Sequence, residues 1–111
     1  MEPISWPDFE KIDIRVGTII EAQPFPKAKK PAYQLTVDFG PLGTRRTSAQ
    51  ITDHYTPENL MGEQVIAVVN FPPKNIAGFQ SECLVLGIYD EANHVVLLAP
   101  KKPVSNGLKI G

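Results

Sequence analysis

The residue types that most often carry out chemistry are scattered along this chain of 111 residues, and their spacing favours no reaction. His54 and His94 have no partner at metal-ligand spacing. No carboxylate pair stands out as an acid/base couple, because the carboxylates with the most distinctive positions lie apart: Asp13, Asp38, Asp53 and Glu82. There is also no glycine-rich phosphate loop and no nucleophile motif. We therefore expect no catalytic residue, metal or cofactor, and predict a binding module.

The single cysteine, Cys83, excludes an intrachain disulfide. It begins the apolar run CLVLG, where a buried and unreactive thiol is the expected state.

Polar residues alternate along the segment from Thr44 to Ile51. Arg46, Ser48 and Gln50 are predicted to share the outer face of a strand, opposite Thr47, Ala49 and Ile51. Such a row is usually a solvated face, but it also suits a surface that binds phosphates or peptide backbone.

Basic residues gather in two connecting segments and on the predicted third strand: Lys27, Lys29, Lys30, Arg46 and Lys74. They either keep the chain soluble or form a basic rim around a ligand. Ser81 and Glu82 begin an otherwise apolar strand. They either mark a strand end in water or exchange hydrogen bonds with a base edge or with peptide amides.

The connecting segment from Asn70 to Phe79 is unusually apolar, since it contains Phe71, Ile76 and Phe79. Apolar side chains in such a segment need a core beneath them or a ligand above them. A lid on the core and a ligand platform are both consistent with this segment alone.

Composition limits the remaining classes of protein to which the chain could belong. The net charge is −1, so the overall charge does not indicate a nucleic-acid binder. No apolar run approaches the roughly 18–20 residues of a membrane span, and the N-terminus lacks the features of a signal peptide. We expect a cytoplasmic protein without membrane insertion.

The elements that must position these residues are mainly strands. Alternation predicts a first strand over 12–22, with Ile14, Val16 and Ile20 on the inner face and a bend at Gly17. Further strands are expected at 33–39, 44–51, 65–69, 83–87 and 95–100, with a short capped helix at 56–62.

A helix between the third and fourth strands of a small all-β chain matches the five-stranded barrel of the OB-fold. In that fold, ligands bind on the face of strands 2 and 3 and in the loops that join strands 1 to 2 and 4 to 5. These loops are PFPKAKKPA and NFPPKNIAGFQ here, so both unusual loops and the Arg46 row should converge on one surface.

Four segments in order, KIDIRVGTI, VDFG, VIAVVNFPPKNIAGFQSE and VVLLAP, resemble the tRNA-binding-domain family of OB-fold modules. The resemblance covers nearly the whole chain. Within the family the chain is most similar to the CsaA-type export chaperones, through FPKAKKPA, TSAQIT and NFPPKNIAGFQSECLVLG.

The resemblance implies one domain over 1–111 that forms a homodimer through extensions at 1–11 and 100–111. A small barrel poorly accommodates four apolar residues of these extensions, and a two-fold interface would bury them: Trp6, Phe9, Leu108 and Ile110. Burial is worth about 1.5–3 kcal/mol for each such side chain, which favours a persistent dimer.

The resemblance also implies a function without catalysis. The first hypothesis is a chaperone-like module that binds unfolded preproteins during export, with the translocation ATPase as a further partner. The alternative is binding of folded tRNA. Phe25 stands where tRNA-binding relatives have histidine, and Leu84 follows Cys83 where they have methionine, which favours the chaperone subgroup.

Both hypotheses place the ligand on the same predicted surface. Its residues are Lys30, Tyr33, Arg46, Ser48, Gln50, Phe71, Pro72, Lys74, Asn75, Ile76, Phe79, Ser81 and Glu82.

Overall fold

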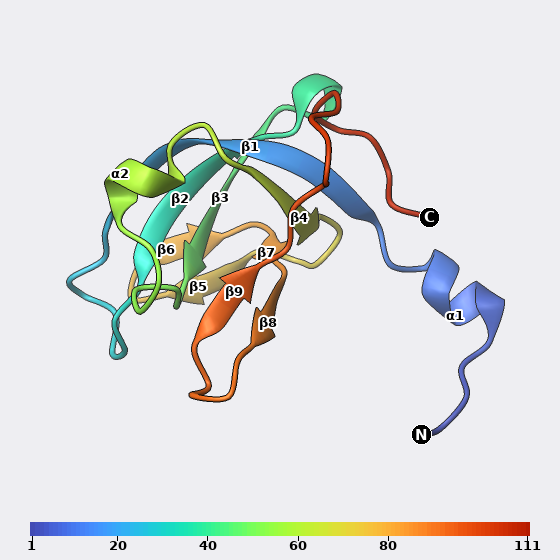
Figure 1. The fold of residues 1–111 in the computed structure, drawn as a ribbon, viewed down its shortest axis with the longest axis horizontal. Coiled ribbons are helices and arrows are strands. Elements are labelled where there is room, and N and C mark those ends of the chain that lie inside the picture. Colours follow the sequence, from blue (N-terminus) through green and yellow to red (C-terminus); the bar gives the residue numbers. More distant parts are fainter.

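The computed structural model describes residues 1–111, and its centre is a five-stranded antiparallel sheet in the order β3-β2-β1-β4-β7 (Figure 1). Its strands are β1 (Ile14–Pro24), β2 (Tyr33–Asp38), β3 (Thr44–Ala49), β4 (Gln64–Val68) and β7 (Leu84–Val85). The sheet curls until the free edge of β3 meets the segment before β7. There the Glu82 backbone N–H donates to the Arg46 carbonyl at 2.7 Å, and the Thr47 hydroxyl donates to the Cys83 carbonyl at 2.8 Å. The predicted OB-fold barrel is confirmed, in a nearly closed form.

The predicted short helix is α2 (Pro57–Leu60), which lies between β3 and β4. Its first turn is closed by a capping box, because the Thr56 hydroxyl accepts from the Asn59 N–H and the Asn59 side chain accepts from the Thr56 N–H. Leu60 is fully buried in the barrel core, so the helix covers the core at this end. The other helical segments are α1 (Trp6–Glu10) and the single turn η1 (Gly40–Leu42).

The barrel core follows the predicted alternation on β2 and the residue after it, since Leu35, Val37 and Phe39 are buried. The full core cluster is Ile19, Leu35, Val37, Phe39, Ile51, Leu60, Val65, Ala67, Val69 and Cys83. Thr47 is the one buried polar residue, and its hydroxyl bonds to the Cys83 carbonyl.

The predicted inner face of β1 was wrong at Ile20, whereas Val16 is buried as predicted. The strand register shifts between Ile19 and Glu21, so Ile20 is the bulge residue and is 40% exposed, while Ile19 enters the core. Gly17 is not the bend. A Cβ there would lie 2.6 Å from Val37, so glycine allows β1 to pack closely on the core. An added residue in a strand reverses the alternation beyond it, and the sequence pattern did not reveal its position.

The apolar segment 70–79 also differs from the predicted irregular loop. Its second half begins a hairpin of β5 (Lys74–Ile76) and β6 (Phe79–Ser81), which turns through Ala77 and Gly78 at positive φ. The Asn75 side chain accepts from the Gly78 N–H at 2.9 Å, which stabilises the turn. A second hairpin of β8 (Gly87–Tyr89) and β9 (Val95–Leu97) follows β7.

Both ends of the chain lie on the same side of the barrel (Figure 1). Helix α1 stands off the barrel and has no buried residue. The C-terminal segment runs along β1, where Val16 donates its N–H to the Leu108 carbonyl and Ile110 donates to the Ile14 carbonyl. No helix is long and apolar enough to cross a membrane.

Candidate functional site

A small apolar cluster joins the two predicted ligand loops. Phe25 of the lysine-bearing loop and Phe79 of β6 are both buried, and their ring centroids lie 5.4 Å apart. Ala32 completes this cluster, and Ile76 packs against it. The two loops therefore converge, as the strand order predicted, and they do so through a second core separate from the barrel core.

Arg46 lies directly over this cluster. Its guanidinium carbon is 4.5 Å from the centre of the Phe79 ring, which is the geometry of a cation–π contact. One guanidinium nitrogen also lies 3.5 Å from the side-chain oxygen of Gln34, and Gln23 donates to that oxygen at 2.8 Å. Three polar side chains from β1, β2 and β3 thus form one row that rests on a buried aromatic ring.

A cleft of about 570 Å³ opens in front of this row, and we call it the Arg46 cleft. It is lined by Gln23, Pro24, Phe25, Pro26, Lys27, Gln34, Arg46, Ala77, Gly78, Phe79 and Gln80. A second hollow of about 320 Å³ continues from it along the strands and shares Gln23, Gln34 and Arg46. Its other lining residues are Glu21, Thr36 and Thr44, so the combined surface mixes polar and apolar groups and carries two cations, Arg46 and Lys27.

The structure brings only part of the predicted site together. Arg46 and Phe79 line the cleft, but Phe79 is 6% exposed and forms its base instead of an open platform. The other predicted residues line neither hollow. Among them, Phe71 is 55% exposed, Ile76 packs against the cluster of Phe25 and Phe79, and five more are exposed: Lys30, Gln50, Pro72, Lys74 and Asn75.

Several predicted ligand contacts are instead used within the protein. The Tyr33 hydroxyl donates to the Tyr55 carbonyl at 2.7 Å. The Ser81 hydroxyl oxygen accepts from the Ser48 N–H at 3.2 Å, and a Glu82 carboxylate oxygen accepts from the Arg46 N–H at 2.8 Å. Ser81 and Glu82 therefore close the barrel against β3, a role that the prediction did not include.

The sequence prediction missed Gln23 and Gln34. These residues are register partners on β1 and β2, and both present amides to the cleft beside Arg46. A signal was available, because a glutamine stands near the end of each of two strands that the OB-fold topology pairs. The bulge at Ile20 concealed their pairing.

The thiol of Cys83 is buried, as expected. It is 6% exposed, and burial raises the pKa of Cys83 to about 11 from a usual value of 9.0. It faces the barrel core and not the cleft.

The residues predicted for a dimer interface are left largely uncovered by the chain itself. Trp6 is 67% exposed and Leu108 is 53% exposed, while Phe9 and Ile110 are half-buried. The Trp6 and Phe9 rings contact each other, with centroids 5.4 Å apart.

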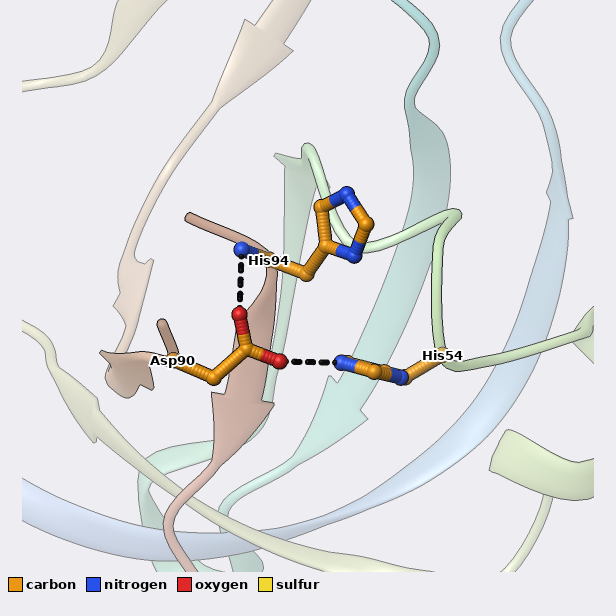
Figure 2. A group of neighbouring side chains, drawn as sticks. All are labelled: His54, Asp90 and His94. Carbon is orange, nitrogen blue, oxygen red and sulfur yellow. Dashed lines mark hydrogen bonds and ion pairs between the residues drawn. The ribbon is translucent and has the colours of Figure 1, made fainter. Parts of the chain in front are cut away.

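The two histidines, for which the spacing offered no partner, lie side by side. The ring centroids of His54 and His94 are 5.5 Å apart, and the Asp90 carboxylate lies next to both residues (Figure 2). They come from the turn before α2 and from the turn of the β8–β9 hairpin. Tertiary structure, not local spacing, brings them together.

A family model and two solved structures each match most of this chain. Residues 14–109 match the family model described as Putative tRNA binding domain. The chain is similar to the crystal structure of the chaperone CsaA from Bacillus anthracis, with 51% identity and a TM-score of 0.94 over 99% of this chain and 100% of that one. It is also similar to the CsaA chaperone protein from Picrophilus torridus, with 49% identity and a TM-score of 0.92 over 98% and 100% of the two chains.

Curated relatives include a much longer enzyme. The methionine–tRNA ligase of Porphyromonas gingivalis is 38% identical over 109 residues, which are 98% of this chain and 16% of that protein. The chain thus spans about one sixth of the length of this relative.

Proposed function

The chain belongs to the tRNA-binding-domain family, and from that membership we propose that it is a non-catalytic module that binds tRNA in the Arg46 cleft. The observation that carries this proposal is the stack of Arg46 on the buried ring of Phe79, beside the amides of Gln23 and Gln34.

The chemistry of this stack suits an unpaired nucleotide. An exposed guanidinium offers a planar surface on which a base can stack, and it also attracts phosphate. The glutamine amides carry both donors and acceptors, which can pair with base edges. Lys27 lines the same cleft and adds a second cation.

The charge distribution favours RNA binding at one small site and not over a broad basic surface. The net charge is −1, so attraction to RNA depends on the few cations at the cleft. We expect the logarithm of the association constant for RNA to fall linearly with the logarithm of the salt concentration. The slope should be about −0.7 to −0.9 for each phosphate contacted.

The test is fluorescence anisotropy with labelled tRNA at two salt concentrations. Arg46→Gln should weaken binding and reduce the salt slope by about one unit. Lys102→Gln is the matched control, because Lys102 is an exposed cation that lines neither hollow. Equal effects of the two substitutions, or equal affinity for tRNA and for an unrelated RNA of the same length, would contradict the proposal.

A second candidate function is binding of unfolded preprotein segments during export, with the translocation ATPase as a further partner. It is favoured by the 49–51% identity to proteins described as CsaA chaperones. Phe71, exposed beside two prolines, would supply apolar contact for an extended segment. Under this hypothesis Phe71→Ser weakens binding of a labelled unfolded peptide while salt has little effect. Steep salt dependence of peptide binding would count against it.

We further propose that two copies associate through the extensions at 1–11 and 100–111. The support is the exposure of Trp6, on a helix with no buried residue, and of Leu108, on a segment that bonds to β1 and to Gln64 of β4. Sedimentation velocity should detect a dimer, and Trp6→Asp should shift it to monomer. A monomeric parent chain at micromolar concentration would overturn this part of the proposal.

A further inference from the structure

The histidine cluster, defined as His54, Asp90 and His94, lies outside the Arg46 cleft and plays no part in the proposed function. Each of its residues offers one ligand atom, and these atoms all lie within 4.8 Å of one another. We propose that this cluster binds a first-row transition-metal ion of the Zn²⁺ class.

Two of the three ligands are already in direct contact. The Nε2 atom of His54 lies 2.7 Å from one carboxylate oxygen, Oδ2, of Asp90. The other oxygen, Oδ1, accepts the backbone N–H groups of Ala92 at 3.0 Å and His94 at 2.8 Å. The hairpin turn therefore fixes the Asp90 carboxylate, and its Oδ2 atom points toward His54 (Figure 2).

A second carboxylate lies near the third ligand, beyond hydrogen-bond distance. Figure 2 shows Nδ1 of His94 on the ring edge that faces Asp90 and His54, with Nε2 on the opposite edge. That Nε2 lies 3.6 Å from a carboxylate oxygen of Asp53. Histidine ligands commonly donate their second ring N–H to a carboxylate, which leaves the first nitrogen unprotonated toward the metal. Asp53 would act as a positioning residue once a small ring rotation brings Nε2 within hydrogen-bond distance, and His94 would bind through Nδ1.

This set of donors selects the class of ion. Imidazole nitrogen with one carboxylate oxygen suits Zn²⁺, Cu²⁺ or Ni²⁺, whereas Ca²⁺ and Mg²⁺ prefer sites made of oxygen ligands. Three protein ligands leave a fourth position for water in a tetrahedral ion. Neither ring is rigidly packed, since both histidine side chains are 41% exposed.

The required movement is small. Ligand atoms about 2.0–2.2 Å from a tetrahedral zinc ion are roughly 3.3 Å from one another. The His54–Asp90 pair at 2.7 Å must open slightly, and the widest separation of 4.8 Å must close. Rotation of two partly exposed imidazole rings accomplishes both without a backbone shift.

Metal binding here would add a link between two segments that already meet where the Leu97 N–H donates to the Tyr55 hydroxyl at 2.9 Å. Asp90 and His94 belong to the β8–β9 hairpin, which forms a separate two-stranded sheet, and His54 belongs to the turn before α2. An ion bound to the folded chain alone raises its stability by mass action. At free zinc about ten times the dissociation constant, the melting temperature should rise by roughly 5–10 °C.

The test is calorimetric titration of the full chain, without an affinity tag, with ZnCl₂ in a non-chelating buffer. We expect one ion per chain. His54→Gln and His94→Gln should each lower the affinity at least tenfold, and Asp53→Asn should lower it by about tenfold, as expected for an orienting partner. Glu91→Gln is the matched control, because Glu91 is an exposed acid of the same turn and is not a member of the cluster.

A spectroscopic readout separates coordination from a change in folding. Two-bond ¹H–¹⁵N spectra of the imidazole rings should show zinc-induced shifts at Nε2 of His54 and Nδ1 of His94. Absence of saturable binding would overturn the proposal and leave only a hydrogen-bonded histidine–aspartate pair. Undiminished zinc binding by the His54→Gln/His94→Gln double variant would also overturn it, because the ion would then occupy another site.

Discussion

The Arg46 cleft and the histidine cluster both gather polar side chains from distant segments, but they are held in different ways. Gln23, Gln34 and Arg46 stand on three paired strands, and Arg46 rests on a buried aromatic ring. His54 and Asp90 instead stand on turns, and their connection is one hydrogen bond at the surface. The cleft is therefore organised by paired strands before any ligand arrives, whereas the cluster lies on turns and its two imidazole rings are partly exposed.

The largest effect should come from removing the base of the cleft. Phe79→Ala deletes a ring that is 6% exposed and packs on Phe25, so we expect a loss of about 3 kcal/mol or more in the free energy of unfolding. Urea denaturation measures it. Phe71→Ala, at a side chain that is 55% exposed, should change stability by about 0.5 kcal/mol at most. Equal losses of unfolding free energy in the two variants would mean that the Phe25–Phe79 cluster does not stabilise the cleft.

Cys83 tests how tightly the barrel is closed behind the cleft. With a pKa of about 11 in the folded chain and 9.0 as the usual value, the thiolate population at pH 8 is about 100-fold lower when the chain is folded. Labelling by a thiol reagent should be slower by at least that factor in native buffer than in urea. Raising the pH toward 11 should narrow the difference. Rapid native labelling at pH 8 would show that the contact between β3 and the Ser81–Cys83 segment opens readily.

Glu82 tests the closure itself. Glu82→Ala removes the acceptor of the Arg46 N–H and should cost about 1–2 kcal/mol. Glu82→Gln keeps an oxygen at the same place and should cost less than half as much. Chemical denaturation of the two variants gives the comparison. If both variants are as stable as the parent chain, the role of Glu82 lies in ligand binding and not in closing the barrel.

The smallest effect should come from the histidine cluster in the absence of metal. His54→Gln breaks one hydrogen bond at a partly exposed site, so the melting temperature should change by about 2–4 °C at most. Differential scanning calorimetry in a chelating buffer measures this change. A much larger decrease would mean that the cluster stabilises the fold without an ion. The cluster and the cleft would then be organised to the same degree.

Much of the fold could be predicted because its signals are local. Alternation along β2 identified the buried faces of Leu35 and Val37, and the Thr56–Pro57 pair located α2. The bulge at Ile20 could not be predicted, because an extra residue in a strand is defined by its partner strand and leaves no mark in the apolar pattern. The β5–β6 hairpin was missed because prolines and aromatic residues hid a three-residue strand on each side of its turn.

The amino-acid sequence by itself determined the order of the five barrel strands and α2, the barrel class, the family resemblance and the convergence of two loops near Arg46. Tertiary structure alone decided that Gln23 and Gln34 stand beside Arg46, that Glu82 closes the barrel, and that His54 lies 2.7 Å from Asp90. The reason is the range of the interactions. Periodicity and capping act over a few neighbouring residues, whereas His54 and Asp90 are 36 positions apart and meet only after strand register and turn geometry have been set.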